Sequence, residues 1–127
     1  MKLWYILAVC CALLAACGNG DSKTADTAEA HERYKPKMGV DVKVEGNKAT
    51  VTVDTDMKIS PEHYGQARKE GEGHIHMYLN NGDKIGVKDG IYVFNDLPPG
   101  TYTLKISLHN NDHTPYDVTD LIHFDIK

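Results

Sequence analysis

The chain has 127 residues, with 14 Lys or Arg, 18 Asp or Glu and seven His, so its net charge is −4 when histidine is neutral. This mildly acidic balance argues against nucleic acid as a partner and against attraction to an anionic membrane surface, and it slightly favours cations. A chain of this length accommodates one small domain with a modest core.

The first 16 residues have the features of a bacterial lipoprotein signal peptide. Lys2 supplies a short positive segment, and the apolar stretch 3–14 is too short to span a bilayer comfortably. The block that follows resembles a lipobox: Leu14-Ala15-Ala16-Cys17. The resemblance implies cleavage before Cys17 and lipidation of its thiol. We therefore expect a protein held by acyl chains on the extracytoplasmic face of the cell membrane. An ordinary secretory signal is the alternative.

Processing at Cys17 would leave the mature protein without a free thiol. Cys10 and Cys11 would leave with the signal peptide, and the loss of Lys2 would change the net charge from −4 to −5. The mature protein would then have no disulfide, no cysteine nucleophile and no cysteine metal ligand. This excludes a blue-copper centre, which needs a thiolate.

Residues 17–38 are predicted to form a flexible tether. They are polar and show no apolar periodicity. About 20 such residues have a root-mean-square span of roughly 25 Å. A tether of this length would lift the following domain off the lipid headgroups.

The period-two alternation of half-buried strands begins at Gly39, so we expect one domain over residues 39–127. Strands are predicted at 40–44, 49–53, 74–80, 84–87, 91–94, 101–109 and 121–127. A short helix is expected from Pro61 to Lys69 with Ser60 as its N-cap, and a hairpin turn at Asn81-Gly82. This series predicts an all-β fold, an immunoglobulin-like antiparallel β-sandwich of about seven strands.

The segment before the 101–109 strand supports this fold. Its sequence is Pro98-Pro99-Gly100-Thr101-Tyr102. It resembles the tight entry into strand F of immunoglobulin-like sandwiches, where a Tyr hydroxyl bonds to upstream backbone. A plain Pro-Gly turn is the alternative.

Five of the seven histidines fall in the second half of the chain, and neutral imidazole is the commonest transition-metal ligand. Alternation places four of them on the outer face of their strands: His74, His76, His109 and His123. If these strands are C, F and G of an immunoglobulin-like sheet, the start of C lies beside the end of F. The first two histidines would then lie near the third.

The other two candidates depend on the connection between the last two strands. His113 lies in the F–G loop and would emerge at the same end of the sheet. His123 is a weaker ligand candidate, because a two-residue register slip moves it by about 7 Å. Asp112 is expected to accept a hydrogen bond from an imidazole N–H. An exposed face on which these histidines are merely solvated is the alternative to a metal site.

The residues also resemble a known group of proteins. The stretches Gly73-His74-Ile75-His76-Met77-Tyr78-Leu79, Leu97–Tyr102 and Leu108–His113 are similar to small extracytoplasmic β-sandwich proteins of the YtkA-like kind and, more loosely, to CopC-like copper-binding domains. The resemblance implies an immunoglobulin-like fold and the handling of copper or another divalent metal at the cell envelope. The chain has no His at a free mature N-terminus, which sets it apart from the CopC pattern.

The sequence thus predicts a lipid-anchored protein that binds a transition metal for sequestration or delivery. Copper is preferred by the Irving–Williams order, and zinc is possible with imidazole ligands. No Ser–His–Asp arrangement or phosphate-binding loop is evident, so we expect no enzyme activity. The alternative is an envelope interaction or adhesin-like module with a protein partner and no metal. Ring nitrogens of His74, His76 and His109 more than about 10 Å apart would favour this alternative.

Overall fold

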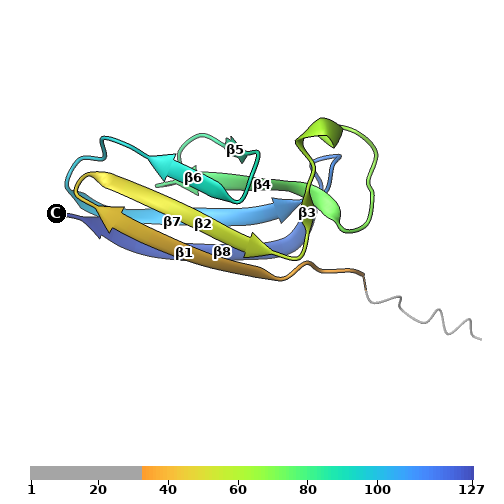
Figure 1. Ribbon diagram of the computed structural model, residues 1–127, viewed down its shortest axis with the longest axis horizontal. Coiled ribbons are helices and arrows are strands. Elements are labelled where there is room, and N and C mark those ends of the chain that lie inside the picture. The colour runs from red at the N-terminus through yellow and green to blue at the C-terminus, as the bar shows by residue number, and fades with distance from the viewer. Residues whose placement is uncertain (1–32) are drawn as a thin grey trace, which may run out of the picture. The chain divides into compact units, whose positions relative to one another are not determined.

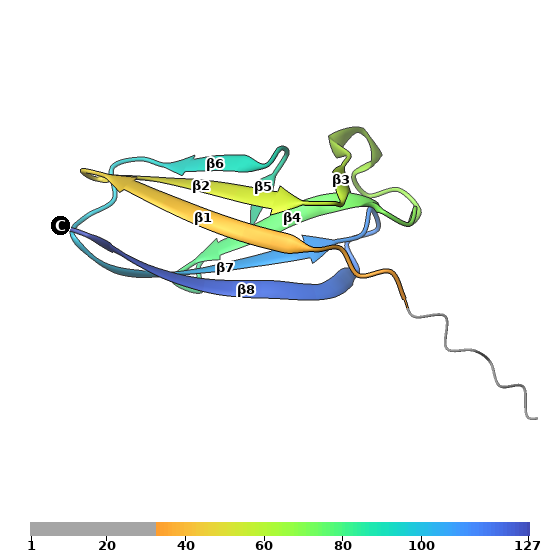
Figure 2. The same cartoon turned by 60° about the horizontal axis from the view of Figure 1, so that its bottom comes forward.

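Residues 33–127 are described by the computed structural model and form two β-sheets packed face to face (Figures 1 and 2). The predicted signal peptide, the lipidation residue Cys17 and the tether up to residue 32 lie outside the described residues. No helix in the described part of the chain is long and apolar enough to cross a membrane.

The two sheets contain eight strands. The first sheet has the order β1-β2-β6, and its strands are β1 (Met38–Glu45), β2 (Lys48–Thr55) and β6 (Ile91–Phe94). The second has the order β3-β4-β7-β8, with β5 also pairing with β4. Its strands are β3 (Lys58–Ile59), β4 (Glu72–Leu79), β5 (Ile85–Val87), β7 (Gly100–His109) and β8 (Pro115–Ile126). The predicted all-β, immunoglobulin-like sandwich is confirmed, and β3, a two-residue strand parallel to β4, was not predicted.

The core lies between the sheets and follows the predicted alternation. Ile75 and Met77 of β4 are 0 % exposed and pack with the apolar positions of the facing sheet, among them Val51. On β7 the buried apolar residues are Leu104, Ile106 and Leu108. Burying side chains of this size stabilises the fold by about 1.5–3 kcal/mol each. This apolar face fixes which way the remaining residues of β4 and β7 must point.

The predicted spatial order of strands C, F and G is also confirmed, because β7 lies between β4 and β8. The antiparallel register pairs His74 with His109 directly. The start of β4 and the end of β7 are therefore neighbours. The register of β7 with β8 pairs Thr103 with His123, and it shifts between Leu108 and His109.

The entry into β7 has the expected tyrosine corner. The Tyr102 hydroxyl donates a 2.6 Å hydrogen bond to the carbonyl oxygen of Pro98. Tyr102 also stacks on Phe124 of β8, with ring centroids 5.4 Å apart. The proline-glycine segment is thus tied to the strand that it precedes.

Two local predictions were wrong. The segment expected to be helical from Pro61 to Lys69 forms only a single 3-10 turn, η1 (Pro61–His63), and Ser60 makes no side-chain cap bond. Gly65 takes a φ of 78°, which stops the turn from continuing as a helix. The hairpin turn after β4 is centred on Asn80 and Asn81, which both have positive φ, one residue earlier than expected.

The segment before β1 packs onto the domain. The Tyr34 ring meets the Tyr116 ring edge to face with centroids 6.0 Å apart, and Asp56 accepts a 2.7 Å bond from the Lys37 amide. Tyr34 and Lys37 fall within the stretch 17–38 that the sequence predicts as a tether. Residues 33–38 therefore add packing surface to the sandwich.

Candidate metal centre

Two histidines of β4 form the centre of the cluster. His74 and His76 are two residues apart, so they share the face of β4 opposite to Ile75 and Met77, as the alternation predicts. They were expected to be exposed on this face, but they are only 2 % and 3 % exposed. The prediction of the face was right, and the prediction of its exposure was wrong.

Segments remote in sequence cover these two rings. Tyr64, directly after η1, has its ring centroid 4.6 Å from that of His74 and 4.4 Å from that of His113. The Gly65 amide donates a 2.8 Å bond to the Asn111 carbonyl. The η1 segment and the loop after β7 thus lie at the same end of the sheet and are joined there (Figure 1).

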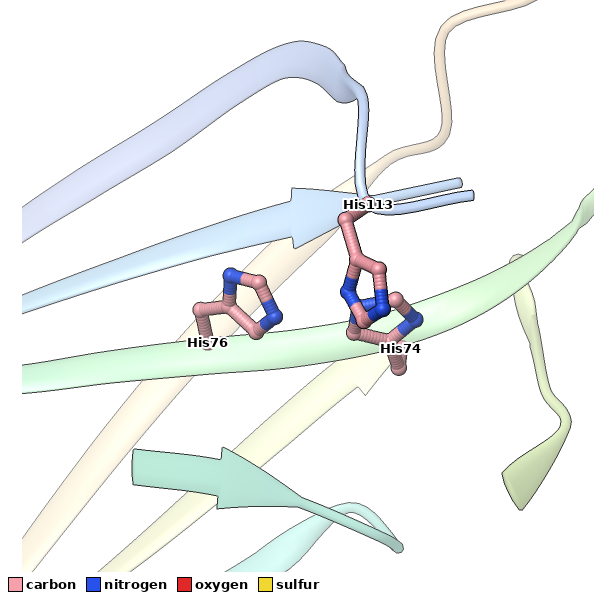
Figure 3. A group of neighbouring side chains, drawn as sticks. All are labelled: His74, His76 and His113. Carbon is pink, nitrogen blue, oxygen red and sulfur yellow. The ribbon is translucent and has the colours of Figure 1, made fainter. Parts of the chain in front are cut away.

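Histidines from three segments converge at this end. Figure 3 shows His74 and His76 on β4 and the ring of His113 reaching toward them from the loop after β7. One ring nitrogen from each lies within 4.8 Å of the others. Two nitrogens bound to one ion at about 2 Å are at most about 4 Å apart. A decrease of about 1 Å in the distances between these ring nitrogens would therefore complete a three-nitrogen site.

The buried nitrogens of this cluster have no protein partners. Both ring nitrogens of His74 and both of His76 lack a hydrogen bond within residues 33–127. Leaving one buried polar group unpaired costs roughly 1–3 kcal/mol, and such groups are rare in folded proteins. A bound ligand or ion would give these four nitrogens the partner that the surrounding side chains do not supply.

Burial keeps both imidazoles neutral. Desolvation, reinforced by the neighbouring histidines and Lys84, lowers the pKa of His74 to about 4 and that of His76 to about 3. A neutral imidazole has the free lone pair that a metal needs. At neutral pH the two side chains are therefore in the form that binds an ion.

The loop after β7 holds His113 in an unusual conformation. Its φ is 70°, which is uncommon for a residue other than glycine. Its amide donates a 2.9 Å bond to the Asn110 carbonyl, and the Asn110 amide donates a 2.8 Å bond to the Thr114 carbonyl. These bonds hold the loop in place, and it directs the ring of the exposed His113 toward β4.

His109 is close to the cluster but has its own partners. Its ring centroid is 3.9 Å from that of His76 and 6.0 Å from that of His74. The His113 carbonyl can only accept, so Nδ1 of His109 donates the 3.0 Å bond to it. In the neutral ring Nε2 then accepts the 2.9 Å bond from the Ser107 hydroxyl. His109 was expected to be a metal ligand; the structure places it beside the cluster, where it fastens the His113 loop.

His123 does not join the cluster. It is opposite Thr103, and its Nδ1 lies 3.0 Å from the hydroxyl oxygen of that residue. Thr103 is six residues from His109 along β7, or about 20 Å. The register that the sequence left open therefore separates His123 from the other four histidines.

Asp112 also departs from its expected role. It was predicted to accept from an imidazole N–H, but its carboxylate accepts from the Thr114 amide at 3.0 Å and from Arg68 Nε at 3.0 Å. The Thr114 hydroxyl also donates to this carboxylate and is the largest cause of the lowered pKa of Asp112. The bonds from the Thr114 amide and from Arg68 lower the pKa further. Asp112 thus closes the loop that carries His113.

Glu72 was missed by the sequence analysis. It precedes Gly73 on β4 and is only 4 % exposed. Its carboxylate accepts a 2.8 Å bond from His63 Nδ1 and lies 3.1 Å from Lys69 Nζ. These contacts lower its pKa to about 2, with the His63 bond as the largest cause. Glu72 thereby links η1 to β4, two residues before His74. Alternation places Glu72 on the same face of the strand as His74 and His76, and this pattern could have identified it from the sequence.

Comparisons with known proteins support the fold alone. No family model matches the chain, and no curated protein does. The structure is similar to the PKD1 domain of Vibrio anguillarum Epp, with a TM-score of 0.50 and 11 % identity over 75 % of this chain and 96 % of that one. It is also similar to the PKD1 domain from the Vibrio cholerae metalloprotease PrtV, with a TM-score of 0.50 and 12 % identity over 73 % of this chain and 98 % of that one. These distant similarities place the chain among immunoglobulin-like sandwiches; they do not name the YtkA-like or CopC-like proteins.

Proposed function

We propose that this protein binds a transition metal through His74, His76 and His113 and sequesters or delivers the ion. The observation that carries the proposal is the set of four buried ring nitrogens without partners next to a third histidine. Three imidazoles that converge within 4.8 Å, two of them buried, suit a divalent ion. We propose that the protein has no catalytic role.

We further propose copper as the preferred metal and zinc as a second possibility. The Irving–Williams order favours copper for nitrogen ligands, and residues 33–127 contain no cysteine to supply a thiolate. The sequence resemblance to YtkA-like and CopC-like proteins supports the same choice. Three imidazoles with an open fourth position also suit zinc.

The location is proposed from the sequence. The lipobox-like block before Cys17 supports a lipid anchor on the extracytoplasmic face of the membrane. The ion would then be held near the membrane surface. An envelope protein could exchange ions with it there.

The geometry does not favour the rival function, a metal-free interaction module. Ring nitrogens of His74, His76 and His109 more than about 10 Å apart would have favoured it, because such ligands cannot share one ion. Those of His74, His76 and His113 lie within 4.8 Å of one another, and the His109 ring is 3.9 Å from the His76 ring.

Calorimetric titration with Cu(II) and Zn(II) tests the proposal. The full chain is used with its three thiols alkylated, so that they do not compete for the ion. We expect one ion per chain and a loss of at least about 100-fold in affinity in a His74→Ala/His76→Ala double variant. The matched control is His123→Ala, which removes an exposed histidine of the same sheet and should leave affinity unchanged. Unchanged affinity in the double variant would refute the site.

The pH dependence of binding differs from that of exposed histidines. Metal ligands must be deprotonated, so the sequence alone predicts weaker binding at pH 5.5 than at pH 7.5. The pKa of His74 and that of His76, about 4 and about 3, lie below both values. These two ligands therefore compete with no protons over this range. We expect substantial binding to remain at pH 5.5.

A further inference from the structure

A cavity of about 430 Å³ borders the histidine cluster at His74. Its other walls include Ile59, Pro61, Val87 and the Tyr64 ring, so its lining is largely apolar. Cavities of about 300–1,000 Å³ are typical of small-molecule sites. This one is large enough for a small organic molecule next to the ion site.

The charge around the cluster is unbalanced when an ion is present. Three neutral imidazoles and a divalent ion carry a charge of +2, and the group that converges contains no carboxylate. Glu72 is already paired with His63 and Lys69, and Asp112 is paired with Arg68. An uncompensated buried charge is costly, so the loaded site favours an anion.

A lysine next to β5 adds to the positive potential. Lys88 directly follows this strand and lines the cavity itself. The cavity thus combines apolar walls with a cation, which suits a molecule that has one anionic end and an apolar body.

The coordination of the ion has room for such a molecule. Three imidazoles leave one position of a four-coordinate ion open. His109 is the nearest further imidazole, but both of its nitrogens are engaged with His113 and Ser107. Because His74 borders both the cluster and the cavity, a donor atom in the cavity can reach an ion that His74 holds.

We propose that the cavity binds a small organic carboxylate whose carboxylate group is the fourth ligand of the ion. Its apolar body packs against Ile59 and Val87, and Lys88 stabilises its charge. This inference rests on the proposed metal site. The protein would then hold its ion as a ternary complex with a small organic acid.

The experiment compares acetate, propionate and butyrate as ligands of the copper-loaded full chain, with its thiols alkylated and in a buffer free of carboxylates. Binding is followed by the visible absorption of Cu(II). Each added methylene buried in the cavity should tighten binding about fourfold. Butyramide, which has the same shape without the charge, should not change the spectrum. The metal-free protein should not bind butyrate.

A lysine variant tests the charge. Lys88→Gln should weaken butyrate binding about two- to fivefold and leave copper affinity unchanged. The matched control is Lys43→Gln, since Lys43 lies on β1 in the other sheet and pairs with Glu45. It should leave butyrate binding unchanged.

Three results are decisive. A copper spectrum that butyrate leaves unchanged would overturn the inference while the metal site stands. Equal affinities for acetate and butyrate would show that the ion attracts any anion and that the cavity plays no part, which also overturns it. Failure of copper itself to bind would remove both the inference and the proposed function.

Discussion

Acidification should destabilise the metal-free protein through His74 and His76. In the unfolded chain each has a pKa of 6.5, whereas burial lowers the pKa to about 4 and about 3 in the folded protein. The folded state therefore binds fewer protons than the unfolded state as pH falls below 6.5. Stability is fully present above this pH and decreases as pH falls toward 3.

The size of the effect follows from these values. Between pH 7 and pH 5 each histidine should lower the free energy of unfolding by about 2 kcal/mol, and the pair by about 4 kcal/mol. This is an upper value, because any water that reaches the rings reduces the desolvation that lowers their pKa. For a domain of this size it corresponds to a decrease in melting temperature of roughly 15–30 °C. The carboxylate of Glu72 does not contribute between pH 7 and pH 5. Its pKa is lowered from 4.5 to about 2, so it changes the free energy of unfolding only below about pH 4.5.

Thermal and urea denaturation of the EDTA-treated protein at pH 7, 6 and 5 measure this change. A His74→Gln/His76→Gln double variant has no titrating group at these positions, so most of the pH dependence should vanish. His123→Gln, the exposed control, should keep it. If the double variant loses as much stability between pH 7 and pH 5 as the parent, the two histidines are not buried as the structure has them.

Three further variants test the surroundings of the cluster by chemical denaturation. Gly73→Ala should be strongly destabilising, by about 3 kcal/mol or more, because a Cβ there would lie 2.0 Å from the His109 carbonyl oxygen. The control Gly86→Ala should be tolerated, because its Cβ would meet no atom within 4 Å. Equal stabilities of the two variants would contradict the close approach of β4 to β7. Tyr102→Phe should cost about 1 kcal/mol by removing the bond to Pro98, with copper affinity unchanged in calorimetry; a neutral effect on stability would argue against the corner. Glu72→Gln should destabilise the protein at pH 7 and flatten its stability profile between pH 4.5 and pH 2, and an unchanged profile would show that this carboxylate is not held by His63 and Lys69.

The sandwich was predictable because its strands alternate cleanly. A buried face is defined by Ile75 and Met77 on one strand and by Leu104, Ile106 and Leu108 on another. Because successive side chains point to opposite faces, this also determines on which face each residue between them lies. The proximity of His74 to His109 followed from the strand order alone, and the structure adds the register that pairs them. This part of the cluster depends on the backbone of the sheet, which the apolar pattern determines.

The burial of the cluster was not predictable in the same way. It depends on Tyr64, which lies in a segment whose Ser-Pro start favours a helix but which ends after one turn. The bond from Gly65 to Asn111 that holds this segment in place joins two irregular loops, and no periodic signal encodes it. The position of His123 likewise depended on the register of β7 with β8, which shifts at Leu108 and His109. Long-range loop contacts and strand registers are the features that local patterns do not determine.

The period-two alternation of strand β4 alone keeps the imidazoles of His74 and His76 on one side and the apolar core residues on the other. Inserting or deleting a single residue between Gly73 and Tyr78 would exchange the two sides for the residues beyond the change, bringing Met77 to the cluster and placing imidazoles in the core. Length changes are thus excluded from this short stretch. The exposed run 66–70 has no such constraint. Natural variation in chain length should therefore gather in that run and stop abruptly at Glu72.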